Sequence, residues 1–253
     1  MLHTSLWMLF FAIAGLSVGS FLNLCIDRLP LSQSIITPPS HCPVCQRRVP
    51  AYDLIPLFNY FWLRGQCRYC RARIPVRLPV IELATGLTFA FLYWKFGTSH
   101  ELGMSLVYAC FMIVIFVIDL EHHLILNKVV YPGIVVAFAF SFVWPELGVL
   151  GALIGGAVGF AFLFLPYLVY PRGMGMGDVK LALMIGLMAG WRGALVALLM
   201  AALVGGLLSL FLLLFRLKRR GEGIPFGPFL AVAAMVALLW GESISDWYLD
   251  LFQ

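Results

Sequence analysis

The stretch at residues 103–120, GMSLVYACFMIVIFVIDL, carries no charged side chain until Asp119. It is close to the roughly 20 apolar residues that cross a bilayer as a helix. The rest of the chain is similar: of 253 residues, 62% are hydrophobic, only 11% are charged, and the mean hydropathy is +0.96. Soluble domains carry roughly 25% charged residues. This composition excludes an ordinary soluble protein and predicts an all-α polytopic membrane protein.

Further apolar stretches bring the predicted number of spans to eight, with six or seven as the alternatives. They cover residues 6–26, 78–96, 129–145, 148–170, 179–196, 197–216 and 226–241. The sixth and seventh spans run nearly together, and we expect Gly190-Trp191-Arg192 to form the turn between them. The first span could be a cleaved leader, but no basic region precedes it and Asp27-Arg28 follow it directly. We therefore expect it to be retained as a helix.

The basic residues predict how these spans are oriented. With the N-terminus outside, the cytoplasmic segments are 27–77, 121–128, 171–180 and 216–225. Every Lys and Arg lies in one of them except Lys95 and Arg192, as the positive-inside rule requires. The net charge of +5 therefore indicates topology and contact with the lipid bilayer, with no nucleic acid as partner. The predicted parts are a first transmembrane helix (1–26), a cytoplasmic insert (27–77) and a transmembrane domain (78–253).

The insert contains two Cys-x-x-Cys pairs, Cys42-Pro43-Val44-Cys45 and Cys67-Arg68-Tyr69-Cys70. Four thiolates at this spacing suit tetrahedral zinc. A segment of about fifty residues is also too small to be stabilised by a hydrophobic core alone, so a metal ion would support its fold. Two disulfides or four idle thiols are the alternatives, and the cytoplasmic placement argues against disulfides.

Two aspartates occupy positions where a membrane protein rarely tolerates charge. Asp119 ends the third span and Asp178 opens the sixth, so both should lie at similar depth on the cytoplasmic side. Two carboxylates at one level can share a proton and activate water. By helix polarity, we expect Asp178 to start as the ionised base and Asp119 as the neutral acid, although such a pair titrates as a unit. A simple interfacial acid is the alternative for Asp119.

The segment before Asp178 is rich in glycine, reading Gly175-Met176-Gly177-Asp178-Val179-Lys180. Glycine lets another backbone approach closely, so Gly175, Gly177 and the neighbouring Lys180 are candidates for contact with a peptide substrate. Other features have simpler interpretations. Small-residue faces for helix packing are Gly15, Gly19 and Ser20 in the first span and Gly151, Gly155, Gly156 and Gly159 in the fifth.

Taken together, the motifs resemble those of the prepilin peptidase family, in the bifunctional form found with type IV pili and type II secretion. The resemblance covers nearly the whole chain. It rests on Gly19 to Asn23, Arg28 to Pro30, the two cysteine pairs, Asp53 to Pro56, Pro79 to Glu82, Asp119-Leu120, Gly175 to Leu181 and Ile224 to Phe229.

The resemblance implies an intramembrane aspartic protease of the bacterial inner membrane. Such enzymes cut the leader of prepilins and pseudopilins, then methylate the new N-terminus with S-adenosylmethionine. The family's catalytic pair corresponds to Asp119 and Asp178, and its zinc-type ligands to the four insert cysteines. The resemblance also implies that the insert carries methyl transfer, with Asp53 and Glu82 as candidate neighbours of the methyl donor.

One departure from the family pattern lies after the third span. Where the family has Ile-Pro-Asp or Ile-Pro-Asn, this chain has Ile125-Leu126-Asn127, so the proline that would rigidify the loop is missing. Three alternative functions remain open. They are a peptidase without methyltransferase activity, an ion-coupled transporter that uses Asp119 and Asp178, and a scaffold whose cysteine module binds a partner.

Overall fold

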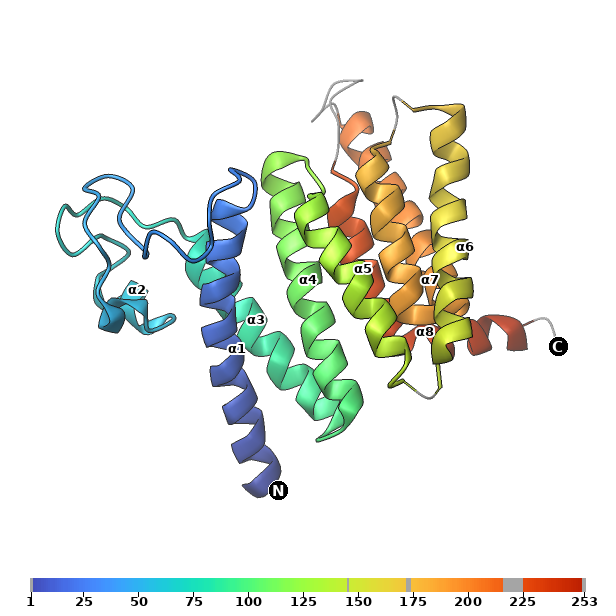
Figure 1. Ribbon diagram of the computed structural model, residues 1–253, viewed down its shortest axis with the longest axis horizontal. Helices are drawn as coiled ribbons and strands as arrows, with labels where there is room; N and C mark the ends of the chain where they lie inside the picture. The colour runs from blue at the N-terminus through green and yellow to red at the C-terminus, as the bar shows by residue number, and fades with distance from the viewer. Residues whose placement is uncertain (1, 145, 172–173, 216–224, 252–253) are drawn as a thin grey trace. The chain divides into compact units, whose positions relative to one another are not determined.

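The computed structural model describes residues 2–144, 146–171, 174–215 and 225–251, which form helices joined by loops (Figure 1). By internal contacts the chain divides into two compact units, one ending at Cys110 and the other beginning at Phe111. Ile224 and parts of the predicted cytoplasmic segments 171–180 and 216–225 lie outside the described ranges. The division at 1–26, 27–77 and 78–253 stays a prediction.

Five helices are long and apolar enough to cross a membrane. They are α1 (Leu2–Arg28), α4 (His100–His122), α6 (Gly148–Val169), α7 (Met176–Leu214) and α8 (Gly227–Asp250). Two further helices fall outside that set: α3 (Arg77–Phe96), which carries charged residues at both ends, and α5 (Asn127–Ser141), which is only 15 residues long. These helices confirm the prediction of an all-α multi-pass membrane protein.

In the first unit, α1 and α3 pack against each other through glycines. A Cβ atom on Gly15 would lie 2.8 Å from the Cα of Gly86, and one on Gly19 would lie 2.8 Å from the Cα of Glu82. Because the earlier glycine of α1 faces the later residue of α3, the two helices are antiparallel. The predicted packing role of Gly15 and Gly19 is confirmed, since only glycine permits such close backbone approach.

The insert connects these two helices through a short 3₁₀ helix, η1 (Ala51–Leu54), and a one-turn helix, α2 (Phe58–Trp62). Where the chain leaves α1, the buried Arg28 donates hydrogen bonds to the carbonyls of Ser34 and Pro38, at 2.8 and 2.7 Å. Asp27 forms an ion pair with Arg77, the first residue of α3. These contacts close the base of the insert.

In the second unit, α6 and α7 also touch backbone to backbone. A Cβ atom on Gly186 would lie 2.0 Å from the carbonyl oxygen of Gly155, and one on Gly159 would lie 2.3 Å from that of Ala182. The pairing of Gly155 with Gly186 and of Gly159 with Ala182 makes α6 antiparallel to the first half of α7. The predicted packing face of the fifth span is thus confirmed for these two glycines.

The long helix α7 is broken at Gly190, whose φ of 67° and ψ of −178° are not helical. Beyond the break, Gly193 lies beside Gly241, and Gly205 lies beside Phe229, so the second half of α7 is antiparallel to α8. Both ends of α7 consequently lie at the same end of the bundle (Figure 1). The predicted turn at Gly190 is confirmed, because glycine adopts this positive φ without strain.

Two predicted boundaries in this unit are wrong. The division between the sixth and seventh spans was expected after residue 196, but the break lies at Gly190. Long apolar runs flank Gly190-Trp191-Arg192 on both sides, so a hydropathy pattern alone does not place the division there. The last span was expected to end at residue 241, but α8 continues to Asp250 through polar residues that a hydropathy pattern does not include.

Candidate active site

Asp119 lies in the last turn of α4 and is buried. One of its carboxylate oxygens, Oδ2, accepts a hydrogen bond of 2.8 Å from the backbone N–H of Gly227. Gly227 is the first residue of α8, and the first N–H groups of a helix have no partner within that helix. Asp119 therefore caps α8 from another helix, and α8 in turn holds the carboxylate in place.

Only glycine fits at position 227. A Cβ atom there would lie 2.6 Å from Oδ2 of Asp119 and 3.0 Å from its Cγ. The sequence reasoning did not assign Gly227 a role beyond the family resemblance. The signal that could have found it is a Gly227-Pro228 pair at the start of an apolar span, because proline is favoured in the first turn of a helix.

Asp178 is the third residue of α7 and is also buried. Its Oδ2 accepts a hydrogen bond of 3.2 Å from the backbone N–H of Gly175, which caps the helix. This is half of a capping box, in which a carboxylate at the third helical position reaches back to the residue before the helix. Gly175 thus orients Asp178.

The two carboxylates lie within electrostatic reach of each other. The use of Asp119 and Asp178 as a catalytic pair stays a prediction. The expected division of roles, however, relied on Asp178 lying at a helix N-terminus and Asp119 lying at a helix C-terminus. Because the N-terminus of α8 contacts Asp119, both carboxylates accept an N–H from a helix start. Helix polarity therefore no longer distinguishes the acid from the base.

The loop between α4 and α5 packs against the start of α7. A Cβ atom on Gly177 would lie 2.8 Å from the Cβ of Ile125, so the space beside this glycine is taken by the chain itself. Lys180 donates a hydrogen bond of 3.0 Å to the side-chain oxygen of Asn127, and its Nζ lies 5.0 Å from the centre of the Tyr131 ring. Contact of Gly175, Gly177 and Lys180 with a substrate stays a prediction.

These contacts explain how the loop after α4 is held without the proline of the family pattern. Leu126 has φ −78° and ψ 126°, a conformation that proline itself adopts. The loop therefore keeps the backbone geometry that a proline would impose, and Gly177 and Lys180 hold it from α7 instead. His123, with a φ of 54°, turns the chain out of α4, and its N–H donates to the carbonyl of Asp119 at 2.9 Å.

In the insert, the four cysteines Cys42, Cys45, Cys67 and Cys70 form one cluster. Their Sγ atoms all lie within 4.8 Å of one another, the four thiols are free, and the Cys42 and Cys70 sulfurs are 3.8 Å apart. Zinc–sulfur bonds of about 2.3 Å in a tetrahedron separate the sulfurs by about 3.8 Å. The donor set therefore fits a metal ion, and the predicted clustering is confirmed.

The two cysteine pairs have the same backbone conformation. In each, the N–H of the first cysteine donates to the carbonyl five residues later, Arg47 in one and Ala72 in the other. The residue after each second cysteine, Gln46 or Arg71, has a φ of 57°. Within the cluster, a hydrogen bond from the Cys45 N–H lowers the pKa of the Cys42 thiol to about 6, whereas the pKa of the Cys70 thiol is raised to about 11, so the first proton is lost most easily at Cys42. This favours the thiolate, the form that binds metal.

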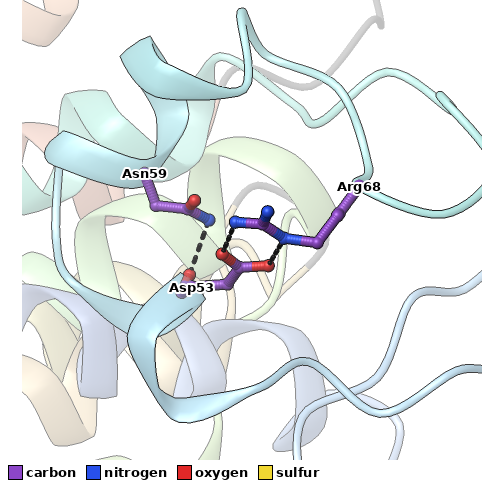
Figure 2. Close-up of polar contacts among 3 residues, drawn as sticks. All are labelled: Asp53, Asn59 and Arg68. Atoms are coloured by element: carbon purple, nitrogen blue, oxygen red, sulfur yellow. Dashed lines mark hydrogen bonds and ion pairs between the residues drawn. The ribbon is translucent and has the colours of Figure 1, made fainter.

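Asp53 is tied to the second cysteine pair (Figure 2). Its carboxylate accepts two hydrogen bonds from Arg68, at 2.5 and 2.8 Å, and Arg68 lies between Cys67 and Cys70 in sequence. The side-chain amide of Asn59 donates to the backbone carbonyl of Asp53 at 2.7 Å. Asp53 therefore connects η1, α2 and the metal-ligand loop. The family resemblance implies a place for Asp53 near a methyl donor, and the sequence does not indicate its arginine partner.

Glu82 is also engaged within the chain. It is buried on α3, and its Oε2 accepts a hydrogen bond of 2.9 Å from the backbone N–H of Leu57. Leu57 precedes α2 and has a φ of 58°, unusual for a residue with a side chain. Glu82 thereby anchors α2 to α3, and a place for either Asp53 or Glu82 beside a methyl donor stays a prediction.

Comparison with known proteins identifies the family. The family model described as the bacterial peptidase A24 N-terminal domain matches residues 13–96, and that of the type IV leader peptidase family matches residues 106–210. A prepilin leader peptidase/N-methyltransferase of Stutzerimonas stutzeri is 33% identical over 94% of this chain and 92% of its own length. The chain belongs to the type IV leader peptidase family.

Two other relatives carry the same name. The protein of Pseudomonas aeruginosa is 31% identical over 98% of this chain and 95% of its own length, and that of Myxococcus xanthus is 38% identical over 83% and 64%. No solved structure matches this chain. The leader peptidase match contains both aspartates and ends before Gly227, so the partner of Asp119 lies beyond the part of the chain that the family model covers.

Proposed function

We propose that this chain is an intramembrane aspartic endopeptidase that removes the leader of type IV prepilins and pseudopilins. It then transfers a methyl group from S-adenosylmethionine to the new N-terminal amine. One observation carries the proposal: Asp119 and Asp178 are both buried at helix ends inside the region that matches the leader peptidase family. The names of the relatives support both reactions, and an ion-coupled transporter is not favoured.

The active site belongs, in this proposal, to the cytoplasmic face of the bacterial inner membrane. Lys128 and Lys180 lie in the first turns of α5 and α7, shortly after the two aspartates in the sequence, and basic residues at the ends of spans favour the cytoplasmic side. We take α3, α5 and the two halves of α7 as spans in addition to α1, α4, α6 and α8. Eight spans with a cytoplasmic insert place the N-terminus outside.

Cleavage then follows the chemistry of a carboxylate pair. The ionised member takes a proton from water, whose oxygen attacks the scissile carbonyl carbon, while the protonated member donates its proton to the carbonyl oxygen. Collapse of the tetrahedral intermediate breaks the C–N bond: the member that took the proton from water donates it to the leaving amine, and the other member takes a proton back from a hydroxyl of the intermediate. Acid–base help of this kind contributes roughly 10²–10⁴-fold. The N–H groups of Gly227 and Gly175 keep the two carboxylates oriented throughout.

Methyl transfer is assigned to the insert, residues 27–77. Cys42, Cys45, Cys67 and Cys70 hold a zinc ion, which in a four-thiolate site is structural. The contacts of Asp53 with Arg68 and of Glu82 with Leu57 support a role for both acids in shaping a site for the methyl donor.

The deciding experiment incubates purified protein with a prepilin and isotopically labelled S-adenosylmethionine, and analyses the products by mass spectrometry. Asp119→Asn and Asp178→Asn should abolish cleavage while metal content and methylation of an already cleaved peptide persist. Glu121→Gln, which changes an exposed acid two residues from Asp119, is the matched control and should cleave normally. Near wild-type cleavage by either aspartate variant would refute the catalytic pair.

A second arm separates the two reactions. Cys42→Ser should release the metal and impair methylation more than cleavage, because the ligand lies in the insert. Equal loss of both reactions would show that the insert supports the whole fold rather than one activity. Unimpaired methylation by metal-free protein would contradict the assignment of methyl transfer to the insert.

A further inference from the structure

The insert displays large aromatic side chains to its surroundings. Within α2, Phe61 and Trp62 are 71% and 70% exposed, and Phe58, which stacks on Trp62, is exposed as well. Residues 57–63 contain no charged side chain. A contiguous exposed apolar surface marks an interaction site.

This aromatic surface is held rigidly. The hairpin formed by residues 53–65 is fixed by the two hydrogen bonds of Arg68 to Asp53 and by the hydrogen bond of Asn59 to the Asp53 carbonyl (Figure 2). At its end, the N–H of Gly65 donates to the carbonyl of Tyr60 at 2.8 Å. Polar contacts therefore keep the aromatic side chains pointing outward instead of letting them collapse inward.

The contact with Glu82 sets the depth of the hairpin. Glu82, which binds the Leu57 N–H through its side chain, comes five residues after Arg77, the start of α3. A helix rises about 1.5 Å per residue, so Glu82 lies about 7.5 Å further along α3 than Arg77. On α1, Gly19 faces Glu82 and comes nine residues before Arg28, a distance of about 13 Å. In Figure 1, α2 accordingly lies well short of the C-terminal end of α1.

The hairpin is therefore on the membrane side of the charged residues Asp27, Arg28 and Arg77. At the same level, α1 and α3 expose apolar side chains, namely Phe21 on α1 and Val80 and Leu83 on α3. These helix surfaces therefore face lipid. Interfacial helices bury their apolar face about 5–10 Å into the boundary between headgroups and acyl chains. The depth of Glu82 below Arg77 on α3 corresponds to that boundary.

We propose that residues 53–65 form an interfacial anchor that inserts the aromatic side chains of α2 into the lipid bilayer beside α1 and α3. Tryptophan and phenylalanine suit this boundary. Arg64 lies two residues after the end of α2, is exposed and has no ion-pair partner among the residues that the structure describes, so it is placed for a lipid phosphate. The anchor fixes the height of the cysteine cluster above the membrane through Arg68. It does not depend on peptidase activity.

Photocrosslinking in native membranes tests the anchor. Phe61 is replaced by benzoylphenylalanine, and the matched control carries the same probe at Val44, which is 69% exposed but lies in the first cysteine pair. Retained metal content shows that each variant is folded. Position 61 should give about tenfold more phospholipid adduct than position 44, because burying an aromatic side chain contributes at least 1.4 kcal/mol, a factor of ten.

Two outcomes would overturn the proposal. One is phospholipid adduct at position 61 no greater than at position 44. The other is crosslinking of position 61 mainly to residues from Phe111 onward, which would make the aromatic surface a contact within the chain. Trp62 provides a second probe position if the variant at position 61 loses its metal.

Discussion

Gly227→Ala tests whether the start of α8 holds Asp119. The added methyl group would lie 2.6 Å from Oδ2, 3.0 Å from Cγ and 3.2 Å from Cβ of Asp119, so the carboxylate must move. Relief of this overlap requires a displacement of roughly 1 Å, because carbon contacts are optimal at about 3.5–4.0 Å. The 2.8 Å hydrogen bond from the Gly227 N–H is then lengthened or lost.

The size of the effect follows from two estimates. A hydrogen bond to a charged group contributes about 1.5–3 kcal/mol, and a misplacement of about 1 Å at a catalytic group costs roughly 10²-fold in rate. Gly227→Ala should therefore reduce the cleavage rate constant by about 10²-fold. Overpacking at a buried site should also lower the free energy of unfolding by about 1–3 kcal/mol.

The assay measures cleavage of a prepilin by purified protein at saturating substrate, together with thermal unfolding in detergent. Gly206→Ala is the matched control, because a Cβ atom at this glycine of α7 meets nothing within 4 Å. It should cleave normally and gain about 0.5–1 kcal/mol from the better helix propensity of alanine. Methylation of an already cleaved peptide should survive in both variants. Normal cleavage by folded Gly227→Ala protein would refute the positioning role of α8.

Three further changes test other contacts. Leu126→Pro should raise the free energy of unfolding by about 0.4–1 kcal/mol, since the native φ of −78° already suits proline; a lower melting temperature would show that the loop is strained differently. Gly186→Ala should destabilise by at least about 1–3 kcal/mol, because its Cβ would lie 2.0 Å from a carbonyl oxygen of α6; an unchanged melting temperature would contradict the helix contact. Asp53→Asn should make tryptic cleavage of the insert about fivefold faster, the equivalent of about 1 kcal/mol, since a carboxylate side chain only 4% exposed loses its arginine partner. Asp27→Asn, which alters a carboxylate 53% exposed in the other ion pair of the insert, is its control; equal rates in the two variants would exclude a special role for Asp53.

Local chemistry explains what could be predicted from the sequence. Apolar runs of span length predict helices because a bilayer leaves backbone groups no other partner, and four cysteines at metal-ligand spacing predict their own cluster. Asp119 and Asp178 stood out because charge is rare in such runs. The turn at Gly190 was predicted correctly, but the division of the apolar run after residue 196 and the end of the last helix at residue 241 were not, because hydropathy measures composition and not backbone angles or the polar last turns of a helix.

The sequence by itself determined the membrane-helical class, the cysteine cluster and the two acidic residues, since each depends on side-chain chemistry that neighbouring residues reveal. Only the tertiary structure decided which groups hold those acids. Gly227 lies 108 residues from Asp119 in the sequence. Glycine suits this position because it has no side chain to overlap with the carboxylate of Asp119. The hydrogen bond from Leu57 to Glu82 could not be predicted for the same reason. A buried hydrogen bond between segments that are distant in the sequence produces no periodic pattern of residues.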